Sequence, residues 1–272
     1  QNVRGLCTKL KDFYLACALD SNYKVIALSE TWLHKGIYDA ELFNLALFNV
    51  SRKNRNYLAT GRKRDGGVLL PIDSNVDATL VDTTAIRKAF IHVVLVKIST
   101  NNLRTTYIVV INYIPPSCDL NTVNIFFDWL LSLDILYNSN ILVMGDFNVP
   151  EFALSSFNSI SSSRCVLIKQ FMNFFNLQQC NKILNSKDGL LDFVFTNRNL
   201  NCSISRSPDP LVAEDDYHPA LNTEFLILRS ECKTSLSAID TEYNFRKCNF
   251  HLLYIALSEI NWAYLSQCSD IN

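Results

Sequence analysis

Short apolar runs alternate along the chain with polar segments that end in Gly, Pro, Asn or Asp. The run 141–144 stops at Gly145, which predicts a strand buried on both faces. The runs 25–28 and 190–197 predict further core strands, as does 221–228. Between these, the runs 68–70, 76–81, 90–98 and 105–114 are rich in Val, Ile and Thr and follow one another without helices, which predicts antiparallel pairing.

Apolar residues at three- and four-residue spacing predict helices over 6–17, 120–137 and 164–176. Asp119 is the expected cap of the second helix, and Ser161 to Ser163 offer a cap for the third. Near residue 229, Ser, Thr, Lys and Glu dilute the apolar residues. We therefore expect one domain over 1–228, and a linker with an amphipathic helix over 229–272 that docks on another part of a longer protein.

The composition is that of a compact protein with a large core, because 49% of the 272 residues are hydrophobic and 19% are charged. No apolar run is long enough to cross a bilayer, so no membrane span is expected. The chain starts at Gln1 without a signal peptide pattern, which favours a fragment of an intracellular protein. The nine cysteines are odd in number and lack the close spacing of zinc ligands, which predicts reduced thiols.

The formal net charge of −1 does not indicate a nucleic-acid binder, so a local basic patch would be needed. Residues 48–64 contain one, with Tyr57 between its two halves. Arg and Lys side chains with an interleaved aromatic ring could follow a phosphate backbone and stack on a base. The alternative is a solvated hairpin. The basic residues of this patch are Arg52, Lys53, Arg55, Arg62, Lys63 and Arg64.

Polar side chains follow several of the predicted strands directly. Asp146 and Asn148 come just past the strand 141–144, at the position where α/β sheets carry their chemistry, and could hold one water or phosphate oxygen between them. The alternative is an ordinary turn. Glu30 follows the strand 25–28 in the same way, although a solvated glutamate would also fit. Asp192 interrupts an apolar run and needs a partner, which His218 in the loop 214–219 could provide unless it is a surface histidine.

The order of these features along the chain resembles the endonuclease/exonuclease/phosphatase superfamily, which has the DNase I-like fold. More narrowly, it is similar to the apurinic/apyrimidinic-type endonuclease domain of non-LTR retrotransposon polyproteins of the jockey-like group. The opening residues 1–6 and the segments 30–33, 65–69 and 215–219 carry the retroelement resemblance, which extends over residues 1–228. The tail 243–262 is similar to the segment that leads toward the reverse transcriptase in such polyproteins.

This resemblance implies an α/β four-layer sandwich of two mixed β-sheets flanked by helices. It also implies hydrolysis of a phosphodiester assisted by Mg²⁺, with Mn²⁺ as a substitute. Glu30 would be the main metal carboxylate, helped by Asn2, and Asp146 would deprotonate the attacking water. Asn148 would position the water or the phosphate. His218, held by Asp192, would donate to a non-bridging oxygen, and Tyr113 would be a second donor.

The sequence departs from the family pattern immediately before His218. The superfamily has Asp at that position, whereas here it is Tyr217, with Asp215 and Asp216 displaced upstream as candidate metal ligands or supports of the histidine. Asn54 also replaces the Asp that is usual in the basic segment of the retroelement branch. The sequence does not decide which of Asp215 and Asp216 would bind metal or support His218.

The resemblance implies an endonuclease that nicks target DNA inside the nucleus and leaves a 3′-hydroxyl to prime reverse transcription. Its partners would be DNA and the remainder of the parent polyprotein, including the reverse transcriptase. Two alternatives remain at this point. One is a phosphomonoesterase or lipid phosphatase of the same fold, and the other is a catalytically inactive relic that only binds DNA.

Overall fold

The computed structural model describes residues 1–19, 23–54, 66–86, 91–99, 106–154, 162–197, 201–225 and 250–259. The chain divides into two compact units, Gln1–Ser230 and Glu231–Asn272. In the second unit the structure describes the helix α6 (Phe250–Glu259), whose described side chains are exposed. Within the described ranges, no helix is long and apolar enough to cross a membrane.

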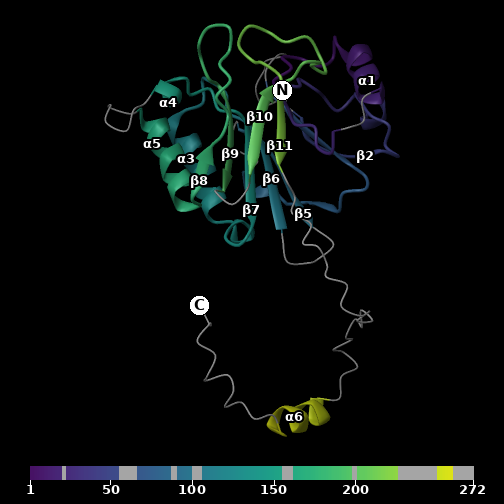
Figure 1. The fold of residues 1–272 in the computed structure, drawn as a ribbon, viewed down its shortest axis with the longest axis vertical. Coiled ribbons are helices and arrows are strands. Elements are labelled where there is room, and N and C mark those ends of the chain that lie inside the picture. Colours follow the sequence, from purple (N-terminus) through teal and green to yellow (C-terminus); the bar gives the residue numbers. More distant parts are fainter. Residues whose placement is uncertain are drawn as a thin grey trace. The chain divides into compact units, whose positions relative to one another are not determined.

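The first unit is built on a six-stranded mixed sheet with the order β4-β5-β6-β7-β9-β8 (Figure 1). The central pair β6 and β7 is parallel, and the other pairs are antiparallel. The bounds are β4 (Ala78–Leu80), β5 (His92–Ser99), β6 (Thr106–Tyr113), β7 (Asn140–Asp146), β8 (Leu177–Gln179) and β9 (Asp192–Asn197).

A second layer of strands faces this sheet. It contains the antiparallel sheet β1-β3-β2 and the hairpin of β10 and β11. The bounds are β1 (Leu28–Ser29), β2 (Phe48–Lys53), β3 (Val68–Asp73), β10 (Cys202–Arg206) and β11 (Leu221–Phe225). Asn2 forms a parallel bridge with Ser29, which holds the first residues of the chain beside β1.

Three hydrophobic clusters separate four layers. One cluster lies between the six-stranded sheet and the helices α3 (Leu120–Leu131) and α5 (Ser163–Phe174). Another fills the space between the two strand layers, and the last packs α1 (Leu10–Leu19) against β1, β2 and β3. Short helical segments complete the fold at η1 (Asp39–Glu41), η2 (Thr84–Ile86), η3 (Asp134–Leu136) and α4 (Glu151–Leu154). The predicted four-layer α/β sandwich is confirmed.

Several boundaries differ from those expected. The helix expected over 120–137 begins at its predicted cap, where the Asp119 side chain accepts from Thr122 N–H, but ends at Leu131. Ser132 Oγ then donates to the Trp129 carbonyl, 2.7 Å away, and the backbone of Leu133 is extended. The strands β2, β8 and β10 were not predicted, because their half-exposed residues lack a clear apolar pattern.

Candidate active site

The register of the six-stranded sheet places several polar side chains in one row at its edge. Tyr113 on β6 is opposite Asp146 on β7, and Asp146 is opposite Asp192 on β9. Residues directly opposite one another point to the same face of a sheet. The side chains of Tyr113, Asp146 and Asp192 therefore share the face that meets the second strand layer. His92 extends the row on β5, where it is opposite Tyr113 with 6.3 Å between the ring centroids.

Gly145 allows β7 to reach this row. Its φ is +145°, and a Cβ at this position would lie 2.0 Å from the Asn112 carbonyl oxygen. No other residue fits so close to the neighbouring strand. β7 continues through Gly145 to Asp146, so the prediction that the strand stops at the glycine is wrong. The glycine instead allows close packing between β6 and β7.

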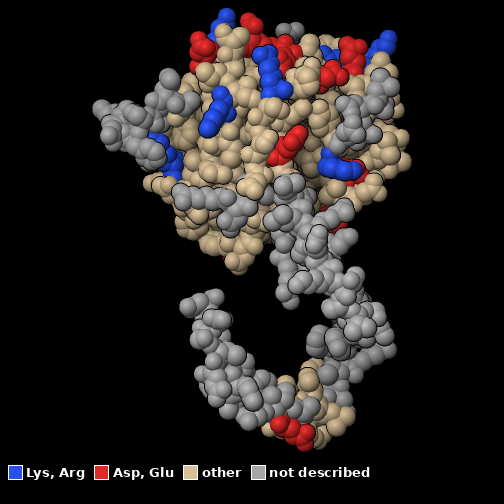
Figure 2. Space-filling model, viewed as in Figure 1, with Lys and Arg blue, Asp and Glu red and all other residues tan. Residues whose placement is uncertain are grey.

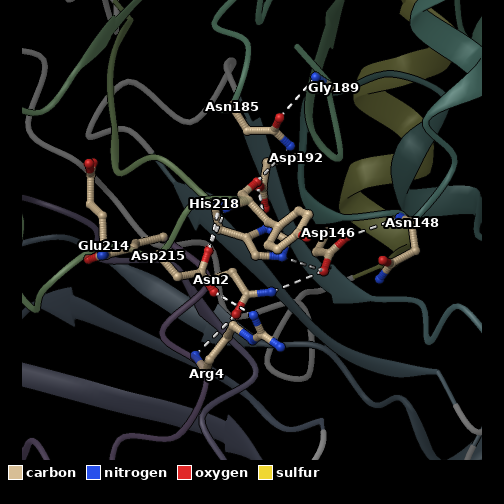
Figure 3. A network of polar contacts seen from close by, with 12 residues as sticks. Asn2, Arg4, Asp146, Asn148, Asn185, Gly189, Asp192, Glu214, Asp215 and His218 are labelled. Carbon is tan, nitrogen blue, oxygen red and sulfur yellow. Dashed lines mark hydrogen bonds and ion pairs between the residues drawn. The ribbon is translucent and has the colours of Figure 1, made fainter. Parts of the chain in front are cut away.

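The buried carboxylate of Asp146 is held by two donors. Asn148 N–H donates to Oδ1 at 3.0 Å, and Asn2 Nδ2 donates to Oδ2 at 3.0 Å (Figure 3). Burial raises the pKa of Asp146 well above its usual value of 3.8, and the charges of Asp192 and Glu30 raise it further, while the charge of His218 opposes them. A carboxylate with a raised pKa is a better base near neutral pH than an ordinary aspartate.

Asp192 and His218 form the ion pair that the sequence suggested. His218 Nδ1 lies 2.8 Å from Asp192 Oδ2, and His218 Nε2 lies 3.8 Å from Asp146 Oδ2. Burial lowers the pKa of His218, but the hydrogen bond and charge of Asp192, with the charges of Asp146 and Asp215, raise it to about 9. The imidazole is therefore protonated at neutral pH, and it points its Nε2–H toward Asp146.

The loop before His218 is fixed by Asp215. Its Oδ1 accepts from the N–H groups of Tyr217 and His218 at 2.8 and 2.9 Å. Partial burial opposes ionisation, but hydrogen bonds from Tyr217 N–H and from Arg4 lower the pKa of Asp215. Asp216 is exposed, and its carbonyl oxygen accepts from Ser186. Asp215 therefore supports His218, while Asp216 anchors the loop through its backbone.

Asn2 and Glu30 enter the site from the second layer, Asn2 from its bridge with Ser29 and Glu30 from the turn after β1. Glu30 directly follows β1 in a left-handed conformation with φ +51°, and its Oε2 accepts from Trp32 Nε1 at 3.2 Å. Asn2 Oδ1 accepts from Arg4 N–H at 3.1 Å. A half-buried carboxylate and an amide oxygen are ligands of the kind that Mg²⁺ takes, since it binds one or two carboxylates and completes its octahedron with water and phosphate.

A second group of metal-ligand residues is Asp146, Asp192 and His218, whose ligand atoms lie within 4.8 Å of one another. Their geometry fits Mg²⁺ less well, since Asp192 and His218 are already bonded to each other and Mg²⁺ prefers oxygen ligands to imidazole. By ligand type, the predicted pair of Glu30 and Asn2 suits Mg²⁺ better than this group does.

The two remaining predicted site residues lie at the same edge. Asn148 has a left-handed backbone with φ +50°, and its Nδ2 donates to the Ile114 carbonyl at 2.9 Å, so its side chain is anchored beside Asp146. The Tyr113 ring is buried with 2% exposure. Arg4 and His92 also lie at this edge but were missed by sequence reasoning. A lone arginine in a turn and a histidine at a strand start carry no local signal of their neighbours.

The basic patch is described only in part. Arg55, Arg62, Lys63 and Arg64 lie outside the described residues. Arg52 Nε forms an ion pair with Asp39 Oδ1 at 2.9 Å, and its side chain is 15% exposed. Lys53 is half-buried at the end of β2. The role of these residues in DNA contact stays a prediction. Figure 2 shows acidic and basic side chains gathered at the upper edge of the molecule, above a mostly uncharged face.

A cavity of about 480 Å³ lies behind the polar row, between the two strand layers. Its walls combine apolar residues such as Ile111, Leu142 and Phe225 with the polar residues Lys24 and Asp192.

No protein-family model matches the sequence, and no curated protein matches it significantly. Solved structures do match. The endonuclease domain of TRAS1, a telomere-specific non-LTR retrotransposon, is 12% identical with a TM-score of 0.55, over 82% of this chain and 94% of that one. The human Nocturnin catalytic domain is 12% identical with a TM-score of 0.58, over 83% and 92%. An AP endonuclease from Archaeoglobus fulgidus is 14% identical with a TM-score of 0.55, over 82% and 96%.

These similarities, together with the layers and the sheet order, define the fold. The chain has the DNase I-like fold of the endonuclease/exonuclease/phosphatase proteins, as the sequence motifs predicted. At 12 to 14% identity the similarity concerns the fold, and the chemistry has to be argued from the side chains of this chain.

Proposed function

We propose that this protein is a metal-dependent endonuclease that hydrolyses phosphodiester bonds of DNA. The observation that carries the proposal is the arrangement at the sheet edge. A buried carboxylate, Asp146, lies 3.8 Å from a protonated imidazole, His218, and the charge of the half-buried Glu30 helps to raise the pKa of Asp146. A base, an acid and a metal ligand are the groups that phosphodiester hydrolysis requires.

The residues divide the reaction between them. Asp146 accepts a proton from the attacking water, which Asn148 helps to orient. Protonated His218 donates a hydrogen bond from Nε2 to a non-bridging phosphate oxygen, and Asp192 keeps the imidazole charged and oriented. Tyr113 is a second donor to the phosphate. Glu30 and Asn2 would hold Mg²⁺, which when bound stabilises negative charge on the phosphate. The water oxygen forms the new bond to phosphorus and the bond from phosphorus to O3′ breaks. O3′ takes up a proton from solvent, so the products are a 3′-hydroxyl and a 5′-phosphate.

Nicking of supercoiled plasmid tests the proposal. With Mg²⁺ the purified protein should convert supercoiled DNA to open circles, and a chelator should stop the reaction. Asp146→Ala should lower the rate by about two to four orders of magnitude, the usual contribution of a general base. Folded protein that does not nick DNA with either Mg²⁺ or Mn²⁺ would contradict the proposal.

The same assay separates the alternatives. Release of phosphate from inositol phosphates, with no action on DNA, would identify a phosphatase of this fold. Salt-sensitive DNA binding that does not depend on Mg²⁺ and gives no turnover would identify an inactive relic.

We further propose that the nick serves insertion of a non-LTR retrotransposon in the nucleus, with the remaining parts of the polyprotein as partners. The sequence motifs around Asn2, Glu30 and His218 support this role, and so does a fold shared with the TRAS1 endonuclease domain. A nick whose 3′-hydroxyl can be extended by a polymerase is the expected product. A 3′-phosphate terminus would rule out priming at the nick.

A further inference from the structure

Arg4 lies at the mouth of the site in a strained turn. Its φ is +40°, and that of Gly5 is +92°. A Cβ on Gly5 would lie 2.3 Å from the Trp32 ring, and Gly5 N–H donates to the Glu30 carbonyl at 2.8 Å. A non-glycine residue in this conformation costs about 1 to 3 kcal/mol and often marks a functional position. The turn at Arg4 and Gly5 therefore packs against the turn at Glu30 and Trp32, and this packing holds the backbone of Arg4 beside Glu30.

The guanidinium of Arg4 joins the two halves of the site. Arg4 Nη1 donates to Asp215 Oδ2 at 2.9 Å, on the loop before His218. The backbone N–H of Arg4 donates to Asn2 Oδ1. The hydrogen bond to Asp215 raises the pKa of Arg4, and the charges of Asp215, Glu30 and Tyr113 add to the effect. Figure 3 shows Arg4 beside Asn2 and Asp215.

Most of the donor capacity of Arg4 is not used. Among the described residues, Nη1 is the only guanidinium nitrogen of Arg4 that makes a hydrogen bond, and the side chain is 50% exposed. Nη2 and Nε therefore remain to bind a ligand. An exposed ion pair contributes little stability, so Arg4 can exchange or share its partner at low cost. Guanidinium groups bind phosphate with two parallel hydrogen bonds, which a lysine cannot reproduce.

We infer that Arg4 is a further catalytic residue, whose Nη2 and Nε hydrogens bind the non-bridging oxygens of the phosphate that is cleaved. This inference rests on the proposed function. Asp215 then has two tasks, since one carboxylate oxygen shapes the His218 loop and the other keeps Arg4 directed at the phosphate.

Single-turnover nicking with saturating Mg²⁺ measures the contribution of Arg4. Arg4→Gln should lower the rate by about two orders of magnitude, in the range for loss of one transition-state donor. Arg4→Lys should recover only part of the rate. Arg206→Gln is the matched control, because Arg206 also pairs with a carboxylate of this loop, Glu214, at 2.5 Å but lies on β10, outside the site. Its rate should equal that of the wild type. Equal rates for Arg4→Gln and the wild type would overturn the inference.

Binding of inorganic phosphate without metal gives a readout that needs no catalysis. Calorimetry should show binding by the wild type and by Arg206→Gln, and at least tenfold weaker binding by Arg4→Gln. Asp215→Asn should bind phosphate more tightly, because it removes the charge that competes for the guanidinium. If Arg4 served only to hold the loop, Asp215→Asn would weaken phosphate binding as Arg4→Gln does. That result, or no phosphate binding by the wild type, would overturn the inference.

The two proposals can fail separately. A protein that binds phosphate through Arg4 but does not nick DNA would refute the nuclease function and leave the phosphate site in place. A protein that nicks DNA equally well with and without Arg4 would refute the role of Arg4 alone.

Discussion

The two strand layers supply different kinds of site residue. The six-stranded sheet provides the buried Tyr113 and Asp146 and the half-buried Asp192, all from strands in register. The second layer provides Arg4 and Glu30 from turns with positive φ, and both side chains are partly exposed. The proposed base, Asp146, thus lies on a strand, where burial raises its pKa. Arg4 and Glu30, which are proposed to bind charged ligands, lie on turns with partly exposed side chains.

If this division is right, the largest effect comes from Asp146. Asp146→Asn keeps the shape of the side chain but removes the base, so nicking should fall by about three orders of magnitude or more. Because burial raises the pKa of Asp146 and disfavours its charged form, the neutral amide should leave the melting temperature nearly unchanged. Plasmid nicking and thermal melting measure the two effects. A rate within tenfold of the wild type would show that Asp146 is not the base.

His218 should have the next largest effect, and a characteristic dependence on pH. The nicking rate should fall above about pH 9, as the imidazole loses its proton. His218→Gln should lower the rate by about two to three orders of magnitude and remove this alkaline decline. A wild-type profile that stays flat to pH 10 would contradict the assignment of His218 as the charged donor.

The same pKa shift predicts how stability depends on pH. The pKa of His218 is higher in the folded state, about 9, than its ordinary value of 6.5. The stabilisation from its protonation is therefore fully present below pH 6.5 and is lost as pH rises through 9. Urea unfolding at pH 6 and pH 10 should show a larger loss of stability for the wild type than for His218→Gln. Equal losses of stability in the two proteins would show that the pKa shift of His218 does not cause this pH dependence.

A smaller effect, and one that metal should correct, is expected for Glu30. Glu30→Gln retains the hydrogen bond that the side chain accepts from Trp32 but weakens an electrostatic ligand of Mg²⁺. The Mg²⁺ concentration for half-maximal nicking should rise at least tenfold, and excess Mg²⁺ should restore much of the rate. Titration with Mg²⁺ measures this. A lower rate at all Mg²⁺ concentrations, with unchanged half-saturation, would assign Glu30 to a different role.

The contribution of the six-stranded sheet was largely readable from the sequence. A glycine after an apolar run indicated a strand end close to Asp146, and an aspartate within an apolar run required the partner that His218 provides. Both signals are local, since they depend on hydrophobic periodicity and on the cost of burying a charge. The row of Tyr113, Asp146 and Asp192 was not readable, because strand register depends on contacts between distant segments.

The turns of the second layer were less readable. Arg4 reaches Asp215 across 211 residues of sequence, and the left-handed backbone of Glu30 has no signal of its own, since glutamate has no preference for positive φ. Arg52 lies between these two cases. A basic residue in a basic segment predicts DNA contact, and in the structure its guanidinium pairs with Asp39.

Arg52 accordingly gives the smallest predicted effect. Arg52→Gln removes the ion pair with Asp39 and the hydrogen bond from Nη2 to the Ile37 carbonyl, so the free energy of unfolding should fall by about 1 kcal/mol. Because the guanidinium is turned toward this loop, the salt dependence of DNA binding should not change. A phosphate contact at Arg52 would instead reduce the slope of log K against log salt by about one. Binding titrations at several salt concentrations therefore decide whether this arginine stabilises the second layer or contacts DNA.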